Sequence, residues 1–320
     1  MRLRKGTTGI DVLHESTGTW IDVTAAGGTD LPSTVVEFLA AGERARDTAR
    51  DLVDSAAGKG DAVASESFAS TPFEPRSLRC FAGWDKHWNQ AAMTMVRRNM
   101  PAVVPLAKAY AAVARKPFPP LRPGSAAVEH PIYYTGNHLT IVGDGDAMPW
   151  PKYTDMLDFE LEFGALVVRP VRDATTEQAA AAIGGFVVFN DFSARDVQWD
   201  EQRNGPFGPV IKTKTFGSSM SAEVVTADEV LPHLGELDGT VTVNGEVWSQ
   251  TSTAGGRWSL VDGLAYASRG ENIGPGELLT SGTLPSGCGM ELDRWIKPGD
   301  TVKLEIGRIG SVTNTVASPA

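Results

Sequence analysis

The chain has 320 residues, 42% of them hydrophobic and 21% charged, so it is long enough to bury a sizeable core. Its formal net charge of −10 argues against a nucleic-acid partner, because phosphate binding requires a basic surface. Two cysteines exclude a disulfide scaffold, and no apolar run reaches the length of about 18 residues that a membrane span needs. We therefore expect a cytoplasmic protein without nucleic-acid or membrane partners.

The N-terminal quarter is expected to form a smaller domain. Its main predicted element is a helix at residues 33–56, which follows two short strand-like segments. Residues 58–71 are rich in Gly, Ala and Ser and predict a surface loop. We place the domain boundary after residue 75, with residues 1–75 as the smaller domain and residues 76–320 as the larger one.

The next part of the chain predicts helices. Residues 83–115 have a helical pattern in which Pro101 permits a break, and the proline-rich residues 116–125 cannot be helix. A short helix is expected at 175–183, opened by threonines and closed by Gly184-Gly185.

Strands are expected to dominate after about residue 130. Asn244-Gly245, within residues 240–248, is a strong signal for a two-residue hairpin turn. Residues 301–306 and 311–316 predict a closing antiparallel pair. The expected class is α+β, predominantly β, with helices around the sheets.

Acidic and apolar residues alternate at residues 158–163. Alternate side chains of a strand share a face, so Asp158, Glu160 and Glu162 are expected to line one face. Such a row is either a solvated face or a cation site, because adjacent carboxylates repel one another without a positive partner. Mg²⁺, Mn²⁺ and Ca²⁺ are the natural candidates, since these hard cations take carboxylate oxygens. A second apolar strand leads directly to another carboxylate, Asp191.

Several short motifs then follow one another in order along the chain. They are Leu157 to Glu162, Phe189 to Gln198, Gly205-Pro206-Phe207, Lys214 to Gly217, Ser281-Gly282-Thr283 and Gly287 to Leu292. In this order they resemble the motifs of the fumarylacetoacetate hydrolase family, a group of metal-dependent enzymes that cleave or decarboxylate β-dicarbonyl acids. The resemblance covers roughly residues 76–316.

The resemblance implies a fold and a metal site. The fold would be a mixed β-roll or barrel catalytic domain behind a variable N-terminal region, in a protein that forms a homodimer. Glu160, Glu162 and Asp191 would be the ligands of Mg²⁺, or of Mn²⁺ or Ca²⁺. Asp158 matches a position that is usually not a ligand, and we expect it to be hydrogen-bonded structure or to contact a ligand.

The same resemblance implies residues that bind substrate or stabilise charge. Lys214 matches a lysine that faces the metal and would stabilise an enolate, whereas Lys212 is expected to be an ordinary surface lysine. Tyr134 and Thr283 match positions that contact the acid or oxo groups of the substrate.

Arg195 and Gln198 match positions near the substrate, and both are assigned here to substrate binding. Arg195 has an alternative role as a structural ion-pair partner of Asp196 or Asp200.

His87 matches the catalytic histidine of hydrolytic members, and Glu291 matches the acid that orients it. Two alternatives stay open: a histidine between two tryptophans is often packed core, and His138 is a rival base or substrate contact. Seven residues before His87, longer members carry an aspartate as a fourth metal ligand, and this chain has Cys80. A neutral thiol is a poor ligand for a hard cation, so we expect Cys80 to be a small buried residue.

These assignments predict a metal-dependent hydrolase that acts on carbon–carbon bonds in ketonic substances, with a β-diketo or acylpyruvate-type acid as its small-molecule substrate. His87 and Glu291 would activate water, and the metal and Lys214 would stabilise the enolate. The alternatives are a decarboxylase of an oxaloacetate-like acid, a keto-acid isomerase or dehydratase on the same site, and a non-catalytic keto-acid-binding protein.

Overall fold

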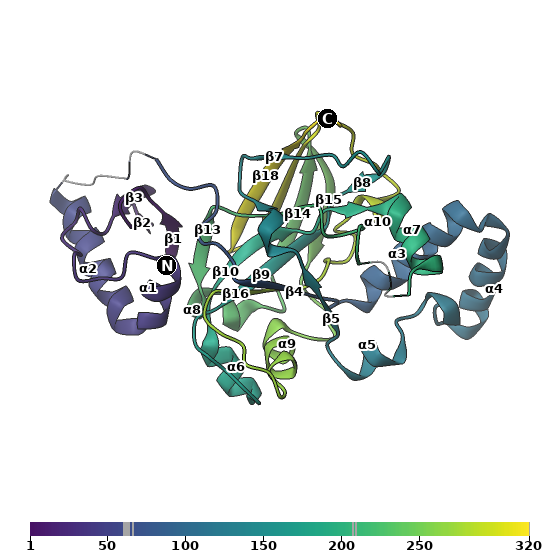
Figure 1. The fold of residues 1–320 in the computed structure, drawn as a ribbon, viewed down its shortest axis with the longest axis horizontal. Coiled ribbons are helices and arrows are strands. Elements are labelled where there is room, and N and C mark those ends of the chain that lie inside the picture. The colour runs from purple at the N-terminus through teal and green to yellow at the C-terminus, as the bar shows by residue number, and fades with distance from the viewer. Residues whose placement is uncertain (60–64, 66, 207, 209, 320) are drawn as a thin grey trace.

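The computed structural model describes residues 1–59, 65, 67–206, 208 and 210–319. An 11-stranded sheet runs through the middle of the molecule (Figure 1). Along its main path the strands are β3 (Thr19–Asp22), β2 (Ile10–His14), β1 (Arg2–Lys5), β13 (Glu223–Thr226), β10 (Ile183–Asn190), β9 (Leu161–Val167), β16 (Glu277–Thr280), β4 (Ser77–Phe81) and β5 (Tyr133–Gly136). Off this path, β12 (Ser218–Met220) pairs with β10 and with β6 (Ile141–Val142).

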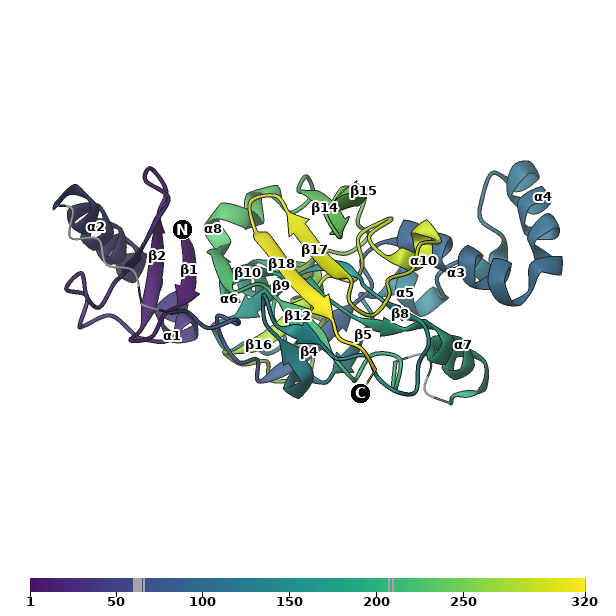
Figure 2. The ribbon, with the colours of Figure 1, turned by 90° about the horizontal axis from the view of Figure 1, so that it is seen from above.

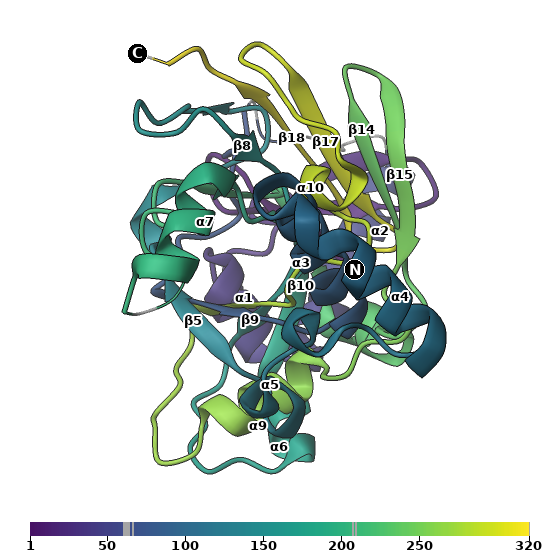
Figure 3. The ribbon, with the colours of Figure 1, turned by 90° about the vertical axis from the view of Figure 1, so that its right-hand side faces the viewer.

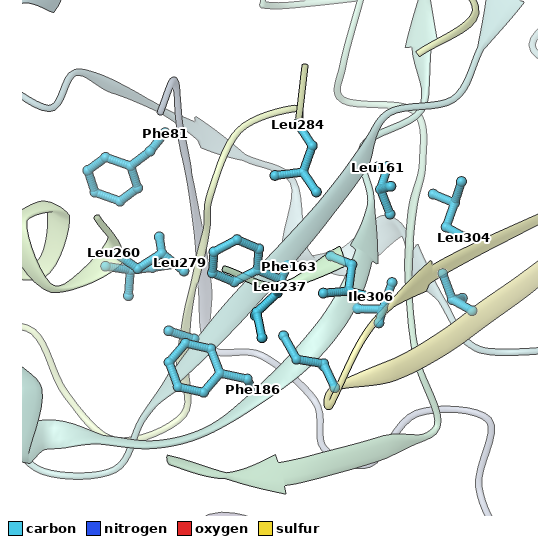
Figure 4. Packing of buried hydrophobic residues seen from close by; sticks show 14 of the residues in the cluster. Phe81, Leu161, Phe163, Phe186, Leu237, Leu260, Leu279, Leu284, Leu304 and Ile306 are labelled. Carbon is cyan, nitrogen blue, oxygen red and sulfur yellow. The ribbon is translucent and has the colours of Figure 1, made fainter. Parts of the chain in front are cut away.

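A second, five-stranded sheet packs against the first. Its order is β15 (Glu246–Ser252), β14 (Asp238–Val243), β17 (Thr301–Ile306), β18 (Gly310–Val316) and β7 (Ala147–Met148). The main hydrophobic core lies between the sheets, where Phe163 and Phe186 of the large sheet share a cluster with Leu304 and Ile306 of the small one (Figure 4). Burial of these large apolar side chains is the main force that holds the two sheets together.

The strand predictions for this part are confirmed. Asn244 and Gly245 have φ of 50° and 81° between β14 and β15, which is the left-handed backbone of a type I′ turn. β17 and β18 form the expected closing antiparallel pair. The predominantly β, mixed class is therefore correct, and in the described residues the large sheet stays open, with β3 and β5 at its ends.

The N-terminal strands extend the large sheet, because β1 pairs antiparallel with β13. Helices α1 (Val35–Ala41) and α2 (Glu43–Lys59) accompany them at one end of the molecule (Figure 1). The single helix predicted at 33–56 is thus divided at Gly42, whose φ of 80° is incompatible with a continuous helix. The predicted loop at 58–71 lies partly outside the described residues, and the domain boundary after residue 75 stays a prediction.

The predicted break at Pro101 is confirmed. Helix α3 (Asp85–Asn99) ends before it, a 3₁₀ turn η1 (Pro101–Val103) follows, and α4 (Val104–Ala114) projects at the end of the molecule opposite the N-terminal unit (Figure 2). In Figure 3, which faces that end, α3 and α4 lie in front of the sheets.

The remaining helices are short. They are η2 (Pro119–Leu121), α5 (Ser125–Glu129), η3 (His138–Thr140), α6 (Thr176–Ala182), α7 (Arg195–Asn204), α8 (Ala227–Val230), η4 (Leu231–His233), α9 (Leu260–Ala267) and α10 (Gly289–Leu292). Helix α6 begins at the predicted place, with a Thr175 capping box. The expected Gly184-Gly185 stop is wrong, because both glycines belong to β10. A Cβ at Gly184 would lie 2.5 Å from Val168 Cγ1, so close packing against the neighbouring strand requires this glycine.

Among the helices of the described residues, none combines the length and hydropathy needed to cross a bilayer.

Candidate metal and proton-transfer site

Two neighbouring strands bring three acids together. β9 and β10 pair antiparallel with Glu162 opposite Phe189, so Glu160, just before β9, meets Asp191, just after β10. The Asp191 backbone N–H donates to the Glu160 carbonyl at 3.2 Å. Carboxylate oxygens of Glu160, Glu162 and Asp191 lie within 4.8 Å of one another, and all three side chains are buried. The structure thus brings together the three acids expected as metal ligands.

Asp158 does not continue this row, because the expected uninterrupted strand is broken. Asp158 ends the short strand β8 (Leu157–Asp158), which pairs with β11 (Ser193–Ala194), and Glu160 forms an isolated bridge with Cys288. The Asp158 carboxylate accepts from Arg195 Nε at 2.8 Å and from both backbone N–H groups of residues 289–290. It is the hydrogen-bonded structural acid that we expected.

Two buried cations contact the acids. Lys214 Nζ lies 2.5 Å from Glu160 Oε2 and 2.8 Å from Asp191 Oδ2, and Arg195 Nη2 lies 2.7 Å from Glu160 Oε1. Burial would raise the pKa of Glu160, but Lys214 and Arg195 outweigh it and hold that pKa well below its usual range. Glu160 is therefore ionised.

Nearby cations do not fully compensate the charges of Glu162 and Asp191. Burial and the charge of Asp191 raise the pKa of Glu162 well above its ordinary value. Burial also raises the pKa of Asp191, and the Lys214 ammonium offsets only part of this effect. Six buried ionisable side chains surround this site: Asp158, Glu160, Glu162, Asp191, Lys214 and Arg195. When all are ionised, four carboxylates face two cations, and the excess of two negative charges fits a divalent cation bound through oxygen.

A glycine loop closes one side of the cluster. The Gly282 N–H donates to Glu162 Oε2 at 3.1 Å, and Gly282 has φ of 81°. A Cβ there would lie 2.5 Å from the Phe81 carbonyl oxygen, so the loop requires glycine. Thr283, the expected substrate contact, follows directly and is buried.

Strand β5 closes another side. The Tyr134 hydroxyl donates to Asp191, and Tyr134 lies opposite Cys80 on β4. Burial, with the charges of Asp191 and Glu162, raises the pKa of the Cys80 thiol well above its ordinary value. Cys80 is 2% exposed, so it is a buried neutral thiol beside the acids, in line with our expectation.

Arg195 links the acids to Gln198. Its Nη1 donates to Gln198 Oε1 at 3.0 Å, one turn along α7. The alternative ion-pair partners of Arg195 were wrong: Asp196 accepts from the Thr154 hydroxyl, and Asp200 accepts from the Asn204 side chain. Arg195 pairs instead with the acids of the site itself.

His87 and Glu291 lie side by side at the contact between α3 and α10. His87 Nδ1 is 3.0 Å from Glu291 Oε2, and the Glu291 side chain is fully buried while that of His87 is 18% exposed. Burial would lower the pKa of His87, but the Glu291 carboxylate outweighs it and raises that pKa above 6.5. The pair lies next to the acid cluster, because Cys288 forms a backbone bridge with Glu160 and the Met290 N–H, beside Glu291, donates to Asp158.

The other expectations have mixed outcomes. His138 is the first residue of η3. Among the described residues, no carboxylate forms an ion pair with His138 of the kind that Glu291 forms with His87. Lys212 lies over the exposed Tyr153 ring at 5.9 Å, as expected of a surface lysine. Phe207 of the Gly205-Pro206-Phe207 motif lies outside the described residues.

Two contacts of the cluster were not anticipated. The Asn190 side chain accepts from the Glu160 N–H at 3.0 Å, and the Ser218 hydroxyl lies 3.4 Å from Asp191 Oδ1. Asn190 stands inside a motif and was identifiable there. Ser218 directly follows the Lys214 to Gly217 motif, and only the pairing of β12 with β10 brings it to Asp191.

Comparison with known proteins identifies the family. A family model described as fumarylacetoacetate (FAA) hydrolase C-terminal matches residues 102–317. The human mitochondrial oxaloacetate tautomerase FAHD2B is 30% identical over 191 residues, which are 59% of this chain and 59% of that protein. A fumarylacetoacetate hydrolase domain-containing protein 2 homolog from Dictyostelium discoideum is 26% identical over 207 residues, 60% of this chain and 65% of that protein. The chain thus spans 59% and 65% of the length of these two curated relatives.

Solved structures show the same fold. A Mycobacterium smegmatis protein provisionally named HpcE has a TM-score of 0.68 at 21% identity, with 99% of this chain and 100% of that chain covered. Fumarylpyruvate hydrolase from Pseudomonas aeruginosa, in complex with Mn²⁺ and pyruvate, has a TM-score of 0.56 at 20% identity, with 79% of this chain and 92% of that one covered. The chain belongs to the fumarylacetoacetate hydrolase family.

Proposed function

We propose that the protein is a divalent-metal-dependent hydrolase that cleaves a carbon–carbon bond in a β-diketo or acylpyruvate-type acid. The observation that supports this most strongly is the pairing of His87 with the buried Glu291 beside a cluster of buried acids. A base oriented by a carboxylate is needed to activate water, whereas decarboxylation requires no such attack.

Glu160, Glu162 and Asp191 would hold the cation, which we propose to be Mg²⁺ or Mn²⁺. Their oxygen donors and their uncompensated negative charge suit a hard divalent ion. A bound cation supplies Lewis-acid polarisation of the two oxygens of a chelating keto acid. The Mn²⁺ and pyruvate in the Pseudomonas aeruginosa hydrolase support this assignment.

The residues of this chain divide the remaining work. His87 Nδ1 faces Glu291, so Nε2 is the nitrogen that would take a proton from water. The water oxygen then bonds to the distal carbonyl carbon, the adjacent carbon–carbon bond breaks, and its electron pair becomes the enolate of the leaving keto acid. Glu291 stabilises the imidazolium formed, which afterwards returns its proton to the enolate carbon.

Positive charge near the acids would stabilise that enolate. Lys214 and Arg195 are buried and ionised. Burial lowers the pKa of each, but Asp191 and Glu160 outweigh it for Lys214, and Asp158 and Glu160 outweigh it for Arg195, so both pKa values are raised. Gln198 orients Arg195 through its 3.0 Å hydrogen bond. Tyr134 and Thr283 are proposed to contact the acid or oxo groups of the substrate.

The alternative function is turnover of an oxaloacetate-like acid, by decarboxylation or by isomerisation on the same site. The similarity to the human oxaloacetate tautomerase favours this candidate. A homodimer and a cytoplasmic location stay predictions.

A substrate panel tests the proposal. The protein, loaded with Mg²⁺ or Mn²⁺, is incubated with acylpyruvates of increasing chain length and with oxaloacetate, and pyruvate, free carboxylic acid, CO₂ and enol absorbance are each followed. Equal amounts of pyruvate and carboxylic acid from an acylpyruvate are expected. Turnover of oxaloacetate alone would establish the alternative, and no turnover despite bound metal would identify a non-catalytic member.

A further inference from the structure

A third donor type stands beside the His87–Glu291 pair. Cys288 Sγ lies 3.3 Å from Glu291 Oε2, the same oxygen that lies 3.0 Å from His87 Nδ1. One ligand atom from each of His87, Cys288 and Glu291 falls within 4.8 Å of the other two. Imidazole nitrogen, thiolate sulfur and carboxylate oxygen together are donors typical of zinc, and the thiolate disfavours Mg²⁺ or Ca²⁺.

The spacing suits one small ion. Zinc–nitrogen and zinc–oxygen bonds of about 2.0–2.1 Å and a zinc–sulfur bond of about 2.3 Å place neighbouring donors of a tetrahedral site roughly 3.3–3.7 Å apart. The 3.0 and 3.3 Å separations need only a small expansion to reach this range. Cys288 and Glu291 stand three residues apart around the start of α10, and His87 comes from α3, so the site joins two elements already in contact.

A second observation also points to a ligand here. His87 Nδ1 is buried and, within the described residues, has no hydrogen-bond partner of good geometry despite the nearby Glu291 oxygen. Burial, Glu291 and Asp158 raise the pKa of the Cys288 thiol well above its ordinary value, so a metal ion that binds its sulfur displaces the thiol proton. The partly exposed side of His87 is the direction from which an ion would enter.

We infer that His87, Cys288 and Glu291 form a second metal site, one that takes a borderline divalent cation such as Zn²⁺, apart from the carboxylate site for a hard cation. Zn²⁺ on His87 Nδ1 would keep the imidazole proton on Nε2, the nitrogen that has to accept a proton from water in the proposed hydrolysis, so micromolar zinc would switch hydrolysis off. Binding at this site does not depend on the proposed function, whereas the inhibition does.

Cobalt absorption tests the site directly. Co²⁺ is titrated into reduced protein that already holds saturating Mg²⁺, because thiolate bound to Co²⁺ gives an intense near-ultraviolet charge-transfer band that oxygen ligands do not give. We expect this band to saturate at one Co²⁺ per chain and to disappear on addition of one equivalent of Zn²⁺.

Matched variants identify the sulfur. Cys288→Ser should abolish the band, and Cys80→Ser, which alters the other buried cysteine, should leave it intact. His87→Ala should weaken Co²⁺ binding at least about tenfold, because loss of a direct ligand costs no less than loss of a residue that orients one. Circular dichroism checks that each variant is folded, with Cys288→Ala as a second test of the sulfur. The inference would be overturned if the wild type showed no band, or if the band were lost in Cys80→Ser.

Inhibition is measured separately. With saturating Mg²⁺, Zn²⁺ should inhibit acylpyruvate hydrolysis, a chelator should reverse it, and Cys288→Ser should raise the half-inhibitory concentration at least about tenfold. If the cobalt band appears but zinc leaves hydrolysis unchanged, the metal site stands and the role of His87 as the base falls.

Discussion

The acid cluster and the His87–Glu291 pair are adjacent, but they are built in different ways. Glu160, Glu162 and Asp191 come from two strands paired in the middle of the large sheet, and all are at most 4% exposed. His87 comes from α3, which leads into α4, where Leu106 and Val113 are 61% and 87% exposed. The first region is held by a sheet ladder and core packing, and the second depends on contacts between helices.

This difference suggests how one fold supports several reactions. Chelation and enolate stabilisation are common to hydrolysis, decarboxylation and tautomerisation of keto acids, and the residues proposed for them lie in the rigid part. His87, the base that hydrolysis would require, lies on helix α3, whose sequence can vary without disturbing the sheet. Variants in the two regions should therefore have different consequences.

The largest effect is expected in the acid cluster. Asp191→Asn removes a proposed metal ligand and a partner of both Lys214 and Tyr134, so every activity should fall about 10³-fold or more, since the cation contributes several kcal/mol. Metal affinity by calorimetry should fall in parallel. Asp200→Asn, on the exposed face of α7, is the control and should be silent. Full metal binding by Asp191→Asn would contradict the assignment.

A large but selective effect is expected at the base. His87→Ala should reduce hydrolysis by at least about 10²-fold, because general-base catalysis contributes roughly 10²–10⁴-fold. Decarboxylation of oxaloacetate should persist, since it needs no activated water. His138→Ala tests the rival base and should leave hydrolysis within a few-fold of wild type. Equal loss of both reactions in His87→Ala would place His87 in the shared machinery instead.

The sequence predicted the acid cluster better than its surroundings, for physical reasons. Glu160, Glu162 and Asp191 follow from strand periodicity and a motif, both of which are local. The break after Asp158 is not local, because its cause is an ion pair with Arg195 and two N–H groups from residues 289–290. No periodicity within residues 158–163 carries that information.

The fold shows the same division between local and distant causes. Pro101 and Asn244-Gly245 act through their own backbone preferences, so the helix break and the hairpin were predictable. Pairing of β1 with β13 joins segments more than 200 residues apart, and Gly184 was misread as a helix stop because Val168 packs over it. Only tertiary structure determines these features.

A moderate effect is expected from pH. The pKa of His87 is raised above 6.5. When the pH falls below this pKa, the imidazole is protonated and cannot act as a base. Hydrolytic kcat/KM should then fall about tenfold per pH unit on the acid side. A bound cation opposes this shift, so the decisive comparison is with Glu291→Gln, whose midpoint should lie at lower pH than that of the wild type. An unchanged midpoint would show that another group controls the acid limb.

The smallest effect is expected in stability. The raised pKa of Glu162 means that the metal-free folded state binds more protons than the unfolded state above pH 4.5, so stability should fall as pH rises from 4.5 through the raised value. Glu162→Gln keeps an oxygen to accept from Gly282 and removes the repulsion from Asp191, so the metal-free variant should melt higher than metal-free wild type at pH 7. Wild type should recover with Mg²⁺ or Mn²⁺, by about 2.7 kcal/mol at a hundredfold excess over Kd, and the variant should respond much less. Calorimetric scans with and without metal check both statements, and a variant less stable than metal-free wild type would mean that the acids do not repel one another in the empty cluster.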